Sequence, residues 1–146
     1  MAKVLIVEDN VMLADMMNDL LVEHGYEVCG VAGTVANAVE LGRRHAPDLA
    51  VIDVRLAGGD SGTEIALQLG DLKKLGILYV TGNISRVILT GAIGHACLAK
   101  PYLDADLLRS LELVADIVAT GTAPPPFPQG FSILQAGPIP ASGVFG

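Results

Sequence analysis

Short, mostly apolar runs rich in β-branched residues alternate with segments of helical periodicity, and this alternation constrains the fold more than any other feature. The runs cover residues 3–7, 26–31, 49–53, 77–81 and 96–99. Each has the length and composition of a strand rather than a helix. Strands that are apolar on both faces indicate a parallel sheet with helices covering both sides.

The segments between these runs carry helix signals. Asn10 and Thr34 stand where helix N-caps are expected, and a fourth helix that starts near Asn83 is diluted by Gly91 and Gly94. The apolar face of the first helix is predicted to consist of Leu13, Met16, Met17, Leu20 and Leu21. Because crossovers are right-handed, we expect an α/β, flavodoxin-like (βα)5 doubly wound parallel sheet with strand order 2-1-3-4-5.

Composition narrows the class of partner. The 146 residues are 51% hydrophobic and carry 16 acidic against 9 basic side chains, a net charge of −7. An acidic chain without a basic stripe argues against direct binding of nucleic acid or of an anionic membrane surface. Cys29 and Cys97 lie far apart without metal-site spacing, which predicts reduced thiols and a cytoplasmic location.

Polar side chains stand at the carboxyl ends of four of the five predicted strands. Glu8 and Asp9 follow the first, Asp53 ends the third, Thr81 ends the fourth and Lys100 follows the fifth. Each has an ordinary explanation alone, such as a solvated turn, a helix cap or a surface lysine. Because ligands of doubly wound sheets bind outside the carboxyl ends of the strands, the set together predicts a functional site.

The chemistry of this set favours phosphoryl transfer. Three clustered carboxylates repel one another and invite a hard cation such as Mg²⁺, which prefers oxygen ligands. A metal and the Lys100 ammonium would neutralise an incoming phosphoryl group, and the Thr81 hydroxyl would donate a hydrogen bond to it. Asp53 is then the natural nucleophile and would form an aspartyl phosphate.

With these residues in register over positions 1 to about 120, the chain resembles the receiver domains of two-component response regulators. The resemblance implies that Asp53 is the phosphoacceptor. The implied Mg²⁺ ligands are Glu8, Asp9, Asp53 and the backbone carbonyl of Arg55. The residues implied to act on the phosphoryl group are Asp53, Thr81 and Lys100. In this family the Lys100–Pro101 peptide bond is usually cis.

The resemblance also implies a function and partners. We expect a stand-alone receiver that takes a phosphoryl group from a histidine kinase or a His-phosphotransfer protein and signals through protein contacts. Its own phosphorylation and dephosphorylation are the only catalysis expected. A homodimer is expected through the helix 4–strand 5–helix 5 face or through the C-terminal tail. Two alternatives stay open, an Asp-nucleophile phosphatase or hydrolase and a degenerate flavodoxin-like binding module.

Three departures from the usual receiver pattern concern the metal site and the switch, meaning the residues that change position when Asp53 is phosphorylated. Cys97 stands three residues before the lysine, where common receivers carry Phe or Tyr. The fourth strand ends in the aromatic-x-Thr-Gly pattern of a receiver subgroup, so Tyr79, which shares strand parity with Thr81, is either a core residue or part of the switch. The loop from Asp53 to Gly62 is rich in glycine and one residue longer than expected.

Residues 121–146 form a tail after the predicted receiver domain of residues 1–120. The tail is uncharged and holds six of the eight prolines and all three phenylalanines. Its Pro and Gly content predicts an extended segment, whereas its aromatic residues and lack of charge argue against a disordered one. We expect Phe127, Phe131, Ile133 and Leu134 to pack on their own domain or, in a swapped dimer, on a neighbour.

Overall fold

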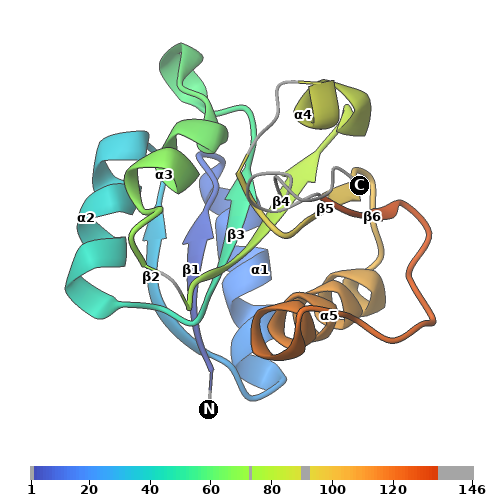
Figure 1. Cartoon of the computed structure of the whole chain (residues 1–146). Coiled ribbons are helices and arrows are strands. Elements are labelled where there is room, and N and C mark those ends of the chain that lie inside the picture. The colour runs from blue at the N-terminus through green and yellow to red at the C-terminus, as the bar shows by residue number, and fades with distance from the viewer. Residues whose placement is uncertain (1, 73, 90–92, 135–146) are drawn as a thin grey trace.

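The computed structural model describes residues 2–72, 74–89 and 93–134 and forms one six-stranded sheet (Figure 1). The strands are β1 (Lys3–Val7), β2 (Glu27–Ala32), β3 (Leu49–Asp53), β4 (Gly76–Thr81), β5 (Ala96–Ala99) and β6 (Phe131–Ile133). Their order is β2-β1-β3-β4-β5-β6. The predicted order 2-1-3-4-5 is confirmed, and these five strands pair in parallel. The sixth strand was not predicted.

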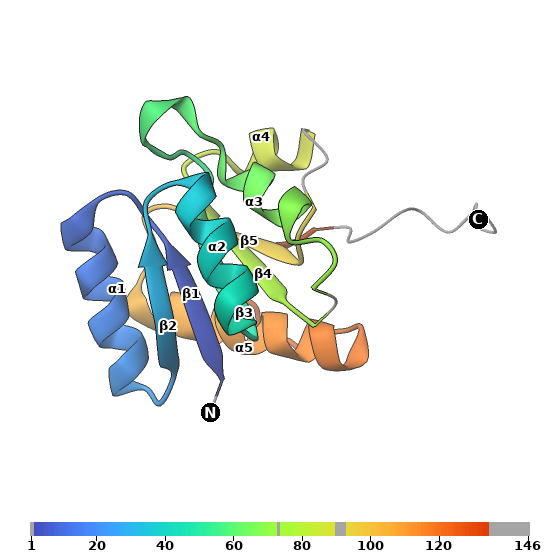
Figure 2. The same cartoon turned by 90° about the vertical axis from the view of Figure 1, so that its left-hand side faces the viewer.

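Helices cover both faces of the sheet (Figure 2). They are α1 (Val11–Glu23), α2 (Val35–His45), α3 (Gly62–Gln68), α4 (Ile84–Leu89) and α5 (Asp104–Thr120), and a short 3-10 turn, η1, spans Ala57–Gly59. One buried cluster packs α2, α3 and α4 against the sheet, and the other packs α1 and α5 against the opposite face. Within the described ranges, no helix has the length and apolar character needed to cross a lipid bilayer.

The predicted N-caps are confirmed. The Asn10 side chain accepts a hydrogen bond from the Leu13 N–H, and the Thr34 hydroxyl accepts one from the Asn37 N–H. Each side chain thereby satisfies an N–H group that has no partner within its helix. These caps start α1 and α2 within three residues of the carboxyl ends of β1 and β2. Gly91, one of the two glycines expected to dilute the fourth helix, lies outside the described residues.

The apolar face predicted for α1 is wider than the face that the sheet buries. Met17 and Leu21 are buried, whereas 46% of Leu13 and 63% of Met16 is exposed. A helix on a sheet buries only the residues that point at the strands, and the remaining apolar positions face solvent. Leu13 and Met16 therefore lie on the surface rather than in the core, which corrects the prediction for these two residues.

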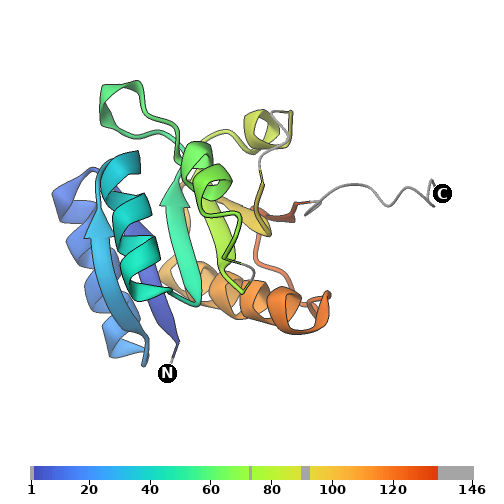
Figure 3. The same cartoon turned by 60° about the vertical axis from the view of Figure 1, so that its left-hand side comes forward.

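The C-terminal segment adds an antiparallel strand to the edge of β5. Leu98 lies opposite Phe131, Cys97 opposite Ser132 and Ala96 opposite Ile133. Figure 3 shows this segment in dark red beside the yellow strand β5. Residues 135–146, including Phe145 of the predicted tail, lie outside the described residues.

Candidate functional site

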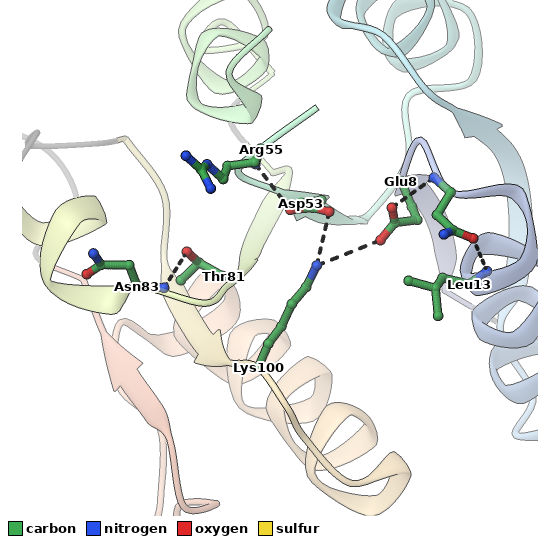
Figure 4. Close-up of polar contacts among 8 residues, drawn as sticks. Glu8, Leu13, Asp53, Arg55, Thr81, Asn83 and Lys100 are labelled. Atoms are coloured by element: carbon green, nitrogen blue, oxygen red, sulfur yellow. Dashed lines mark hydrogen bonds and ion pairs between the residues drawn. The ribbon is translucent and has the colours of Figure 1, made fainter. Parts of the chain in front are cut away.

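The sheet brings the predicted site residues to one edge. Asp53 and Thr81 are the last residues of β3 and β4, and Glu8 and Lys100 directly follow β1 and β5. Because β1, β3, β4 and β5 are parallel neighbours, their carboxyl ends meet at this edge (Figure 4). Asp53, Glu8 and Thr81 are buried, so the site is set into the sheet edge rather than displayed on a loop.

Lys100 joins the two buried carboxylates. Its Nζ lies 3.1 Å from Asp53 Oδ2 and 4.0 Å from Glu8 Oε1. Dashed lines in Figure 4 mark both contacts. The side chain reaches the site from β5, whose last peptide runs into a cis Lys100–Pro101 bond, as the family resemblance implies. One ammonium therefore partly balances two carboxylates that are removed from bulk water.

Backbone N–H groups hold the carboxylates in place. The Arg55 N–H donates to Asp53 Oδ1 at 3.1 Å, and the Asn10 N–H donates to Glu8 Oε2 at 3.0 Å. Each of the two carboxylates thus has one oxygen fixed by backbone and one that faces Lys100. Sequence motifs carry no signal for such donors, because any residue except proline supplies an N–H at these positions.

The acidic cluster has the composition of a site for a hard cation. Carboxylate oxygens of Glu8, Asp9 and Asp53 all lie within 4.8 Å of one another. Burial raises the pKa of the Glu8 carboxyl above its ordinary value; the Asn10 N–H opposes this shift and the Asp53 charge adds to it. A cation with oxygen ligands relieves such repulsion, and Mg²⁺ fits this donor set. The Arg55 carbonyl stays a predicted ligand.

Thr81 faces its own turn rather than Asp53. Its hydroxyl oxygen accepts a hydrogen bond from the Asn83 N–H at 3.0 Å (Figure 4). Its carbonyl oxygen accepts one from the Lys100 N–H at 2.8 Å, which ties the end of β5 to the end of β4. Thr81 is thus near the cluster, and because a hydroxyl that accepts one hydrogen bond can also donate one, its O–H can serve a group bound to Asp53.

Comparison with known proteins identifies the family. The sequence profile of the response regulator receiver domain matches residues 4–112. The chain belongs to the response regulator receiver family. It is 33% identical over 116 residues to the transcriptional regulatory protein PdtaR of Mycobacterium tuberculosis, covering 76% of this chain and 55% of that protein. The receiver therefore spans about half the length of this curated relative.

Other relatives agree. This receiver is 32% identical over 103 residues to the chemotaxis protein CheY of Bacillus subtilis, covering 70% of this chain and 78% of CheY. The structure of the signal receiver domain of a modulated diguanylate cyclase from Desulfovibrio desulfuricans matches with a TM-score of 0.70 at 30% identity, covering 83% and 98% of the two chains. The fold and the two-component signalling family predicted from the sequence are confirmed.

Cys97 stands in this receiver where common family members carry an aromatic residue, and Tyr79 lies next to it. The two are register partners on β4 and β5, and both side chains are fully buried. The Tyr79 hydroxyl donates to the carbonyl of Ile93, and burial raises the pKa of this phenol above its ordinary value. A Cβ on Gly94 would lie 2.5 Å from the Tyr79 ring, so the ring packs directly on this glycine.

Sequence reasoning missed a groove beside the acidic cluster. It has a volume of about 470 Å³ and is lined by α1, by the start of α5, and by Glu8 and Lys100 of the site. Its apolar walls include Leu13, Met16 and Tyr102. The signal was present in the width of the apolar face predicted for α1, because Leu13 and Met16 of that face line the groove.

Proposed function

We propose that this receiver accepts a phosphoryl group on Asp53 from a phosphohistidine of a partner protein in an Mg²⁺-dependent reaction. The observation that carries this proposal is the contact of 3.1 Å between Lys100 Nζ and the buried Asp53 carboxylate, inside a cluster with Glu8 and Asp9. A nucleophilic carboxylate, a cation site and a fixed ammonium are the parts that phosphoryl transfer to a side chain needs.

In the proposed reaction, an Asp53 oxygen attacks phosphorus as the bond from phosphorus to the histidine nitrogen of the partner breaks. The imidazole leaves with that electron pair, and Asp53 becomes an aspartyl phosphate. Lys100 balances negative charge on the phosphoryl oxygens, and the Thr81 hydroxyl, whose oxygen accepts from the Asn83 N–H, donates its own O–H to one of them. Mg²⁺ held by Glu8 and Asp9, when bound, would neutralise further charge.

The groove along α1 supports a protein as the phosphoryl donor. Met16, which lines the groove, is 63% exposed, and Val11 and Met12 at the start of the same helix are 74% and 73% exposed. Apolar side chains exposed in a group mark protein contacts, and helix-in-groove packing is a common way to cover them. We propose that a helix carrying the phosphohistidine, from a histidine kinase or a His-phosphotransfer protein, binds here, because Glu8 and Lys100 line the same groove.

Output is proposed to pass through protein contacts, with no catalysis beyond the chemistry of Asp53 itself. The described residues form a receiver with one added strand, and the division at residue 120 stays a prediction. The free thiols Cys29 and Cys97 suit the proposed cytoplasmic location. A homodimer through the α4–β5–α5 face or through a swapped tail also stays a prediction.

Intact mass spectrometry tests the proposal. The protein is incubated with a small phosphodonor, with and without Mg²⁺. We expect one added phosphoryl group in the presence of Mg²⁺, none in Asp53→Ala, and normal modification of Asp60→Ala, which removes an exposed carboxylate from the same loop. Rapid turnover of the donor without a lasting adduct would instead favour the hydrolase alternative.

A further inference from the structure

The strap, residues 122–134, covers the outer edge of β5. The Ala99 N–H donates to the Gly130 carbonyl at 3.0 Å, and the Leu134 N–H donates to the His95 carbonyl at 2.9 Å. Phe131 packs with the cluster beneath α5, and Leu134 is buried in the cluster on the opposite face. Without the strap, β5 would present an open edge of four uncharged residues, the kind of edge that sheets normally protect.

The strap is also tied to α5. The Arg109 guanidinium donates to the carbonyl of Pro124 at 2.9 Å and to that of Pro126 at 3.3 Å. The Phe127 and Phe131 rings stack with centroids 5.6 Å apart. Since α5 holds one end of the strap, the whole strap does not simply follow a displacement of β5.

Two consecutive N–H groups connect the strap to the acidic site. The Ala99 N–H points outward to Gly130 of the strap, and the next one, of Lys100, points inward to the Thr81 carbonyl. The Lys100 side chain then contacts Asp53 at 3.1 Å. The strap therefore bonds to Ala99, and the next residue in the chain, Lys100, contacts the proposed phosphoacceptor Asp53.

We propose that docking of the strap on β5 is coupled to the state of Asp53, and that a phosphoryl group on Asp53 loosens the strap. This inference rests on the proposed function. A phosphoryl group on Asp53 attracts the Thr81 hydroxyl, whose oxygen accepts from the Asn83 N–H, and the Lys100 ammonium toward the end of β3. The strand β4 lies between β3 and β5, and the N–H of Lys100, which directly follows β5, donates to the Thr81 carbonyl at the end of β4. A shift of the end of β4 toward β3 therefore draws the end of β5 toward β3 as well.

That movement takes β5 away from the strap, which Arg109 holds on α5. The contact at Gly130 is close, since an added Cβ there would lie 3.2 Å from the Ala99 Cβ. The ladder has only three register pairs, and 48% of Ile133 is exposed, so the strap is a short element to detach. Loosening it uncovers the β5 edge as a strand-pairing surface that forms only in the phosphorylated state.

Amide hydrogen exchange of the full chain tests the coupling. Beryllium fluoride with Mg²⁺ serves as a phosphoryl analogue that binds reversibly, and its binding is followed independently by fluorine NMR. We expect the Ala99 and Leu134 amides to exchange about fivefold faster or more when the analogue binds, the lower range of usual couplings. The amides of β1 serve as the internal reference and are expected to stay unchanged.

A Ser132→Cys variant provides a lock with its own control. Ser132 lies opposite Cys97, and directly opposed residues of an antiparallel pair have Cα atoms about 4.5–5.5 Å apart, which a disulfide can bridge. The oxidised chain holds the strap on β5, and the reduced form of the same chain is the matched control. Because coupling is reciprocal, we expect the oxidised chain to bind beryllium fluoride about fivefold more weakly than the reduced one.

The outcomes separate the two proposals. Binding of the analogue with unchanged exchange at Ala99 and Leu134, or equal affinity of the oxidised and reduced Ser132→Cys chains, overturns the coupling and leaves the proposed function intact. If the wild-type chain binds no analogue at all, the proposed function fails and the coupling fails with it. Faster exchange together with weaker binding by the locked chain supports the coupling.

Discussion

Replacing Gly62 with Ala is expected to damage the fold and the site together. Gly62 is the first residue of α3, and an added Cβ would lie 2.2 Å from the Asp53 carbonyl oxygen and 2.6 Å from the Ile52 Cγ2. The nearer obstacle is backbone, so the strand that carries Asp53 must shift. Overpacking of this kind costs about 3 kcal/mol, which lowers the melting temperature of a chain this size by roughly 10 °C.

The same shift displaces the proposed nucleophile. A misplacement of about 1 Å at a reacting group costs about a hundredfold in rate, so we expect phosphoryl incorporation into Gly62→Ala to slow by about that factor. Gly42→Ala is the matched control. Its Cβ would lie 2.6 Å from Leu69 Cδ1, the end of a flexible side chain, and alanine favours the helix interior by about 1 kcal/mol.

Urea unfolding and a time course of intact mass measure the two effects. We expect Gly42→Ala to stay within about 1 kcal/mol of the wild-type free energy of unfolding and to keep its rate of phosphoryl incorporation. If Gly62→Ala matches Gly42→Ala in both measurements, the inference that α3 packs too closely on the Asp53 backbone to admit a Cβ at residue 62 is wrong.

Three further predictions concern other parts of the molecule. Leu134→Ala should lower the free energy of unfolding by about 2 kcal/mol in urea titrations, and an equal loss in the half-exposed Ile133→Ala would contradict the buried position of Leu134. Lys100→Met should lower the free energy of unfolding by about 1–2 kcal/mol, because Asp53 and Glu8 then lack their cation. Added Mg²⁺ should restore most of this lost stability, and a loss that Mg²⁺ leaves unchanged would argue against the cation site. Burial lowers the pKa of His95, whose Nδ1 accepts a hydrogen bond from the Ile77 N–H. The imidazole therefore takes up a proton more readily in the unfolded chain than in the folded one, and the free energy of unfolding falls as the pH drops below about 6.5. Melting curves across this pH range should show a smaller loss of stability in His95→Gln than in the wild type, and an equal loss would refute the assignment of this pH dependence to His95.

Much of the site could be predicted from the sequence because parallel strands share a direction. Once residues 3–7, 49–53, 77–81 and 96–99 are strands of one parallel sheet, the polar residues that end them must meet at one edge. Asp53 and Glu8 needed no further information to be placed side by side. The backbone donors at Arg55 and Asn10 could not be predicted, because their positions depend on the turns that follow the strands.

The sixth strand lay beyond sequence reasoning for a different reason. Phe131, Ser132 and Ile133 follow a run of prolines, and a run of this composition predicts an extended linker. What makes these residues a strand is the open edge of β5, a tertiary feature that no local pattern contains. The sequence also predicted too wide an apolar face for α1. The position of the helix on the sheet, a tertiary feature, determines that Met17 is buried and Met16 is exposed.

The most direct test of the account is the site of modification after incubation with a small phosphodonor and Mg²⁺. Peptide mapping of the modified protein is predicted to place a single phosphoryl group on Asp53, with the signal lost when Mg²⁺ is chelated. Asp9→Asn, which weakens the acidic cluster but keeps the nucleophile, should slow the reaction without moving the adduct. A phosphoryl group on any other residue, or one that forms at the same rate without Mg²⁺, would contradict the account.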